Sequence, residues 1–226
     1  MQRKHEQSVA DGFSNHFSKI AMQQGRTLNR CSLDGQDAIL GADYIFTTTT
    51  KFALIEFKYE ERDIKAESRK SLRAQLCTLL DSEMNRRSQS LQCHYIAWSK
   101  KRQTRTAHFN NYYPEVCNNQ VFNSLVTPLI NQQKQTSSRI SADVVIESFL
   151  NGEIGSNYYT FKQYTNWLIS LGGHEGSTVE VMLDNPTSEQ LEILDFTSLD
   201  LMKSWLDHNQ PNRRSTYRPE PPSPFG

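Results

Sequence analysis

Residues 41–58 read GADYIFTTTTKFALIEFK, and this stretch decides the fold. Thr, Ile, Phe and Tyr dominate it and favour the pleated state, which predicts two strands joined by the threonine run 47–50. Side chains alternate along a strand, so Glu56 and Lys58 face the same side. The second strand is apolar on both faces until these two charges end it. Since a buried, unpaired charge is costly, a compensating group must lie nearby.

Pairing the two strands brings a second carboxylate to the same place. A two- or four-residue loop centred on residues 49–50 sets Phe46 opposite Ala53, and the same register sets Asp43 opposite Glu56. Directly paired residues have Cβ atoms roughly 4.5–5.5 Å apart, where like charges repel. A divalent cation between the carboxylates resolves this repulsion, and Mg²⁺ prefers one or two carboxylates together with water and phosphate. A loop of odd length would shift the register and remove the pair.

These residue types predict phosphodiester hydrolysis with Mg²⁺ or Mn²⁺. Asp43, Glu56 and the backbone carbonyl of Phe57 are the candidate metal ligands. A cation held there polarises a phosphate and lowers the pKa of a bound water. Lys58 is placed to orient that water or to stabilise charge on the phosphorus.

Asp43, a spacer and Glu56-x-Lys58 at the end of an apolar strand resemble the PD-(D/E)XK nuclease superfamily. The resemblance implies a restriction-endonuclease-like core, in which helices flank a mixed sheet, over about residues 5–100. It also implies a metal-dependent nuclease and favours DNA over RNA as the substrate. Ala42 stands where the nominal motif has proline, and the C-terminal half is not covered.

The resemblance also implies auxiliary residues. Some members carry a glutamine in the helix that follows the lysine, and Gln75 is the matching residue here. It lies within about 60° of the leucine stripe of that helix, counting ~100° per residue, so it is predicted to face the sheet and reach the site. Leu79 replaces the tyrosine that those members place four residues later. Glu6 is the candidate for an acidic residue contributed by the first helix.

The pattern of apolar residues predicts an α/β fold in three parts: a nuclease-like core at 1–125, a mixed, mainly helical extension at 126–208 and a flexible, proline-rich tail at 209–226. The helices are predicted at 6–24, about 70–80, 120–132, 141–150, 159–171 and 197–208. Besides the hairpin, strands are predicted at 27–33, 91–98, 179–183 and 191–196.

The net charge of the chain limits how it can bind nucleic acid. Lys and Arg number 25, as do Asp and Glu, so the formal net charge is zero. A chain that binds nucleic acid tightly by itself is usually basic. Either the cations gather on one face, or a protein partner or second copy supplies affinity. The basic stretch Lys100, Lys101, Arg102 and Arg105 fits a phosphate contact and a solvated loop equally well.

The chain shows no secretory signal and no apolar run long enough to span a membrane, which predicts a cytoplasmic protein that binds no membrane. Four scattered cysteines without a CxxC motif predict reduced, buried thiols rather than a zinc site or disulfides. A role in a defence, repair or mobile-element complex is a further expectation from the resemblance.

Three alternatives remain open. Lys58 could form a plain cross-strand salt bridge with Asp43 or Glu56. Asp34 or Asp37 could replace Asp43 as the first ligand, although both suit a turn beside Gly35. The chain could also be a non-catalytic scaffold or nucleic-acid-binding module of the same fold, or an unrelated α/β interaction protein.

Overall fold

A computed structural model describes residues 3–33, 35–123, 128–173, 177–185, 188 and 190–209. The alternative ligand Asp34 and the predicted tail beyond residue 209 lie outside these residues. No helix in this described part of the chain is long and apolar enough to cross a membrane.

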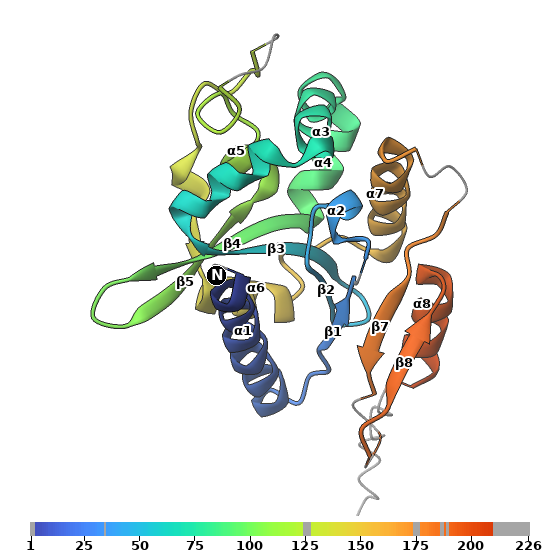
Figure 1. The fold of residues 1–226 in the computed structure, drawn as a ribbon. Coiled ribbons are helices and arrows are strands. Elements are labelled where there is room, and N and C mark those ends of the chain that lie inside the picture. The colour runs from blue at the N-terminus through green and yellow to red at the C-terminus, as the bar shows by residue number, and fades with distance from the viewer. Residues whose placement is uncertain are drawn as a thin grey trace, which may run out of the picture.

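One mixed sheet of eight strands runs through the described residues in the order β6-β5-β4-β3-β2-β1-β7-β8 (Figure 1). The strands are β1 (Asn29–Ser32), β2 (Tyr44–Thr47), β3 (Phe52–Glu60), β4 (His94–Lys101), β5 (Arg105–Asn111), β6 (Ile140–Ser141), β7 (Val181–Asp184) and β8 (Ile193–Phe196). The pair β3–β4 is parallel and the other neighbours are antiparallel. Strands from the predicted extension thus complete both edges of the sheet that the predicted core begins.

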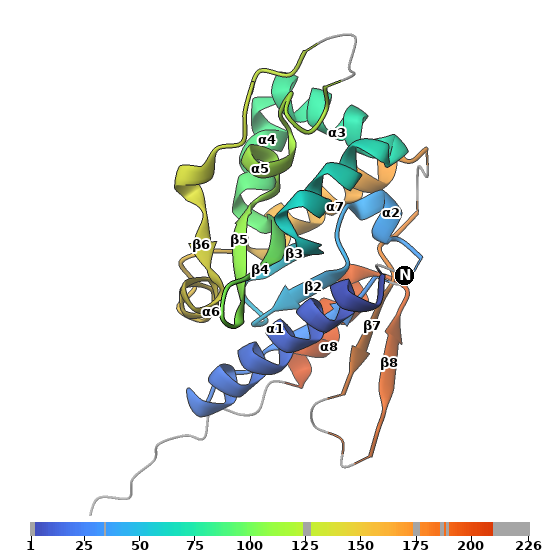
Figure 2. The ribbon, with the colours of Figure 1, turned by 60° about the vertical axis from the view of Figure 1, so that its left-hand side comes forward.

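Helices cover both faces of this sheet (Figure 2), which confirms the coarse α/β class. They are α1 (Arg3–Gln23), α2 (Asp37–Leu40), the 3-10 helix η1 (Glu61–Arg69), α3 (Ser71–Ser82), α4 (Met84–Cys93), α5 (Tyr112–Val116), the 3-10 helix η2 (Thr136–Ser138), α6 (Ala142–Leu150), α7 (Tyr158–Leu171) and α8 (Leu199–His208). Helices α1 and α6 share one core layer, whereas α2, α3, α4, α5, α7 and α8 share the other.

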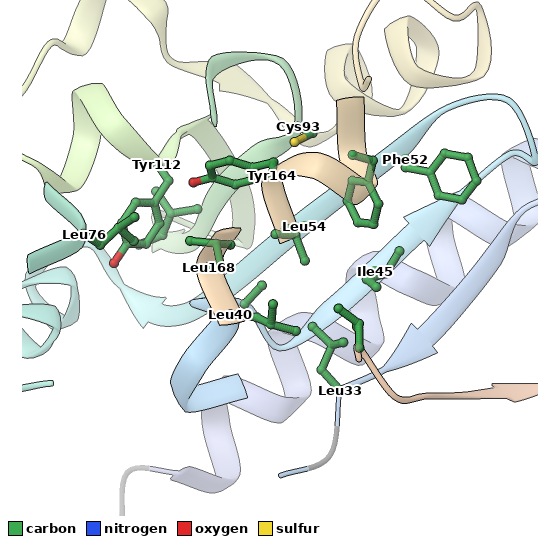
Figure 3. Close-up of a cluster of buried hydrophobic side chains, with 14 of the residues drawn as sticks. Leu33, Leu40, Ile45, Phe52, Leu54, Leu76, Cys93, Tyr112, Tyr164 and Leu168 are labelled. Carbon is green, nitrogen blue, oxygen red and sulfur yellow. The ribbon is translucent and has the colours of Figure 1, made fainter. Parts of the chain in front are cut away.

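Strand β3 separates the two layers through its alternating side chains. Phe52 and Leu54 pack with Leu40, Tyr164 and Leu168 (Figure 3). The side chains between them face the layer of α1 and α6. By the same alternation, Glu56 and Lys58 point to the face of Phe52 and Leu54. Glu56 and Lys58 therefore point to the sheet face on which η1 and α3 lie.

The predicted hairpin is confirmed in its register. Phe46 pairs with Ala53, and the Thr48 N–H donates to the Lys51 carbonyl at 3.1 Å. The Asp43 N–H donates to the Ile55 carbonyl at 3.0 Å, one step beyond the last strand pair. Asp43 therefore lies opposite Glu56, as the even loop length requires.

Other elements differ from the prediction. Residues 91–93 belong to α4, whose buried residues are Gln89, Ser90 and Cys93, so no apolar stripe marks it as a helix. Strand β5 was not predicted, because its sequence RTAHFNN has little apolar alternation; pairing with β4 and β6 decides its state. The helix predicted at 120–132 is wrong in its described part. There the side chain of Asn119 bonds backbone groups of Leu129 at 2.8 and 2.9 Å, and such bonds compete with a helix.

The prediction of four reduced thiols is wrong for two cysteines. Cys77 of α3 and Cys117, directly after α5, form a disulfide with an S–S distance of 2.04 Å across a sequence separation of 40. Such long-range pairing leaves no spacing motif in the sequence. Cys31 and Cys93 remain free and buried, and burial raises the pKa of each thiol to about 12.

Candidate functional site

The site lies beside the part of β3 that extends beyond the first residue of its antiparallel neighbour β2. Strand β2 begins at Tyr44, while β3 runs on to Glu60. The space beside the exposed edge of β3 is an open pocket of about 500 Å³, lined by Asp43, Glu56, Phe57, Lys58 and residues of α1, η1 and the β1–α2 turn. The end of a strand pair thus creates the cavity.

Asp43 takes the place of the missing strand neighbour. Its Oδ2 accepts a hydrogen bond from the Phe57 N–H at 2.6 Å. The Ile55 carbonyl already points toward β2, so by backbone alternation the Phe57 N–H and carbonyl both point to this side. Burial and the nearby Glu56 carboxylate raise the pKa of Asp43 to about 8. Burial is the larger of the two causes, so the pocket without a cation favours the protonated form of Asp43.

Glu56 is buried and bound on one oxygen only. Its Oε1 accepts from Lys58 and, at 2.6 Å, from Lys70. Burial alone would raise the pKa of Glu56, but the two lysines outweigh it and lower the pKa to about 2. Its Oε2 is buried without a hydrogen-bond partner. A buried carboxylate oxygen without a donor is costly, and this oxygen of Glu56 is therefore available to a ligand.

Lys58 is a fixed cation. Its Nζ lies 3.1 Å from Glu67 Oε1 and 3.3 Å from Glu6 Oε1, in addition to its bond to Glu56. Burial would lower the pKa of Lys58, but these carboxylates raise it well above its usual value. A lysine held in the charged form can stabilise an anion or orient a water, and it cannot act as a general base.

Glu67 is the principal residue that sequence reasoning missed. This η1 carboxylate is fully buried, and its Oε1 lies 2.9 Å from the Nζ of Lys70. Its Oε2 accepts from the Tyr112 hydroxyl at 2.8 Å and lies 3.3 Å from the Nε of Arg73. Glu67 falls within a charge-rich run, and nothing in such a run distinguishes a buried acid from a solvated one.

The structure joins Asp43, Glu56, Phe57 and Lys58 in one pocket and adds Glu6, which the first helix supplies as anticipated. Asp37 also lines this pocket. Gln75 does not join them.

The prediction that Gln75 faces the sheet is wrong. The residue is exposed, because α3 buries Arg73, Leu76, Cys77 and Leu80 instead. The leucine stripe that predicts the buried face leaves out Arg73. The buried guanidinium of Arg73 donates to the backbone carbonyls of Asp37 and Ile39. Lys70, directly before α3, is the residue that reaches the pocket from this segment.

The residues present fit a hard cation with few protein ligands. Within the described residues, no group of three or more His, Cys, Asp or Glu side chains is arranged to hold a metal ion. Mg²⁺ characteristically needs only one or two carboxylates. Asp43, the unpartnered Oε2 of Glu56 and the Phe57 carbonyl meet that requirement.

Comparison of the sequence with family models finds no match, and comparisons with curated proteins and with solved structures find none either.

Replacing Asp43 by asparagine is expected to stabilise the metal-free protein at pH 7.5 by roughly 1–3 kcal/mol. Asparagine keeps an acceptor for the Phe57 N–H and removes the charge beside Glu56. The pKa of Asp43 lies near 8 in the folded chain and at 3.8 ordinarily. Between these values the folded state holds a proton that the unfolded state lacks, so stability falls as pH rises through the window. The gain from asparagine should therefore shrink toward pH 4.

Urea unfolding in EDTA at pH 7.5 and pH 5 measures this difference. A loss of stability in Asp43→Asn at pH 7.5 would instead identify Asp43 as a structural salt-bridge partner.

Proposed function

We propose that this protein is a metal-dependent nuclease of the PD-(D/E)XK type, with a restriction-endonuclease-like core, that hydrolyses phosphodiester bonds and favours DNA. One observation carries the proposal. Asp43 lies opposite Glu56 at the end of a strand pair, with a buried carboxylate oxygen unpartnered and a charged lysine two residues further on. Electrostatically unfavourable carboxylate pairs of this kind are characteristic of functional sites.

The residues have separate roles in this proposal. Asp43, Glu56 and the Phe57 carbonyl would hold Mg²⁺ or Mn²⁺, which when bound polarises the phosphate and acidifies a water. Lys58 stabilises negative charge on the scissile phosphate. Lys70 is a second cation within the same pocket, and Glu67 holds both lysines in place.

The net charge of the chain bears on the source of its affinity for nucleic acid. Zero net charge supports a nuclease whose protein partner or second copy contributes affinity for the nucleic acid. A cytoplasmic defence, repair or mobile-element complex remains our expectation for such a subunit, with no membrane involved. The disulfide is more typical of oxidising compartments, so it argues against the cytoplasmic part of this expectation.

A second candidate function is a non-catalytic scaffold or nucleic-acid-binding module. It is favoured by the two lysines on Glu56, which neutralise that carboxylate without any metal. Metal binding separates the two candidates.

Titration calorimetry with Mn²⁺ tests the proposal. The wild-type protein is expected to bind Mn²⁺ at one site and Asp43→Ala to bind none, since the mutant lacks a ligand but keeps Glu56. Lys203→Ala serves as a control, because it removes an ion pair with Asp207 on α8, outside the pocket. Absence of binding in the wild type would support the scaffold.

A further inference from the structure

The hairpin formed by β4 and β5 projects beyond the body of the protein (Figure 1). Lys101 pairs with Arg105, so the chain reverses over residues 102–104. Lys100, Lys101 and Arg102 are exposed. Within the described residues none of these three cations forms an ion pair shorter than 4.0 Å, and, against the effect of burial, Lys100 adds to Arg139 and Lys134 in lowering the pKa of Glu61. We call residues 100–105 the basic hairpin tip.

Positive charge is concentrated in this part of a neutral chain. Residues 84–114 contain six Lys and Arg and no Asp or Glu, although the whole chain has zero net charge. The remainder of the chain therefore carries six negative charges in excess. Arg86 and Arg87 belong to α4, whereas the other four cations of this stretch lie in the basic hairpin tip, which is the local concentration of positive charge that binding to nucleic acid requires.

The basic hairpin tip and the pocket lie toward the same end of the sheet, where β3 and β4 reach their C-terminal residues. Strands β3 and β4 are parallel, and Lys58 pairs with Trp98. At about 3.3 Å per residue, Lys100 to Arg102 follow roughly 7–13 Å beyond that pair. Charges at this spacing can contact phosphates that flank a phosphate bound in the pocket.

Tyr59 connects the tip to the pocket. It lines the pocket, and the Arg105 guanidinium lies 4.1 Å from the centre of its ring. Arg105 also donates to Glu60 at 3.2 Å. The His5 ring lies 5.0 Å from the Tyr59 ring. These contacts hold Arg105 at the start of β5, so the exposed cations of the basic hairpin tip project from a fixed position.

We propose that the basic hairpin tip binds the phosphate backbone of a nucleic-acid duplex whose scissile strand enters the pocket. This inference rests on the proposed function, since it assigns a substrate-holding element to that site. A two-stranded ribbon fits the major groove of a duplex, and Lys and Arg are the main donors to phosphate oxygens. Contacts of this kind carry affinity without sequence information.

Fluorescence anisotropy tests the inference with a labelled 30-base-pair DNA duplex in EDTA, over a series of KCl concentrations. The variant Lys101→Ala/Arg102→Ala is expected to bind at least about tenfold more weakly than wild type at low salt. It should also lower the slope of log K against log [KCl] by about 2, one unit for each lost phosphate contact.

The control variant Lys19→Ala/Arg26→Ala removes the same charges from the last part of α1 and from the turn that follows it, and Lys19 lies about 20 Å along the helix from Glu6. It is expected to bind within about twofold of wild type, since these cations lie away from the tip. Equal weakening of both variants, no weakening of the hairpin variant, or no duplex binding by the wild type would each overturn the inference.

The outcome does not depend on hydrolysis, because no divalent cation is present. Duplex binding through the tip without metal-dependent cleavage would remove the nuclease proposal and leave the hairpin assignment standing. If the wild type shows metal-dependent cleavage and the hairpin variant binds the duplex as tightly as wild type, the hairpin assignment is overturned and the nuclease proposal stands.

Discussion

Replacing Glu67 by glutamine is expected to lower the free energy of unfolding by about 3–5 kcal/mol. Glutamine keeps the volume and removes the charge. It would leave the buried Arg73 guanidinium without its carboxylate partner, while Lys58 and Lys70 would share the remaining acids. Removing one member of a buried charge network is costly, because the desolvated partners stay behind unneutralised.

Chemical denaturation at pH 7.5 measures the loss, with Glu60→Gln as the matched control. Glu60 also binds two cations, Arg62 at 3.0 Å and Arg105 at 3.2 Å, but it is partly exposed. Exposed pairs contribute about 0–1 kcal/mol. Equal effects of the two substitutions would show that the Glu67 network is solvated and contributes no more than a surface pair.

Replacing Lys58 by methionine is expected to lower the rate of DNA cleavage at least about 100-fold, the scale of removing one positioned donor from a transition state. Lys58 is held in the charged form by Glu6, Glu56 and Glu67, so its ammonium is the preorganised positive charge of the pocket. Lys70 is more exposed and reaches the same Glu56 oxygen, so Lys70→Met should have a smaller effect, about tenfold.

Relaxation of supercoiled plasmid at saturating Mn²⁺ measures both rates, and circular dichroism establishes that the variants are folded. Lys65→Met is the control. Lys65 is exposed on η1, so this variant should cleave at the wild-type rate. A larger loss in Lys70→Met than in Lys58→Met would transfer the transition-state role to Lys70.

Local pattern was enough to predict the centre of the site. Asp43, Glu56 and Lys58 belong to one hairpin, and strand alternation with an even loop determines which side chains meet. Although it failed for the helix expected at 120–132, the same logic predicted α6, α7, α8 and the strand pair β7–β8. Their apolar periodicity is strong, and the Ser198 side chain caps the last helix by accepting from the Leu201 N–H.

Contacts between distant segments could not be predicted. Glu67, Lys70 and Arg73 enter the site because η1 folds back against β3 and α5, and a run of charged letters does not reveal that path. Gln75 was placed on the wrong face because a buried arginine was not expected in the stripe. The Cys77–Cys117 disulfide likewise depends on how α3 packs against α5.

Cleavage of plasmid and single-stranded DNA with Mn²⁺, comparing wild type with Asp43→Ala, tests the central claim most directly. We predict cleavage by the wild type that is lost in EDTA and in Asp43→Ala, while the mutant remains folded. Equal cleavage by wild type and mutant would contradict the assignment of the site. No cleavage by a wild-type protein that also fails to bind Mn²⁺ would contradict the nuclease and leave the scaffold.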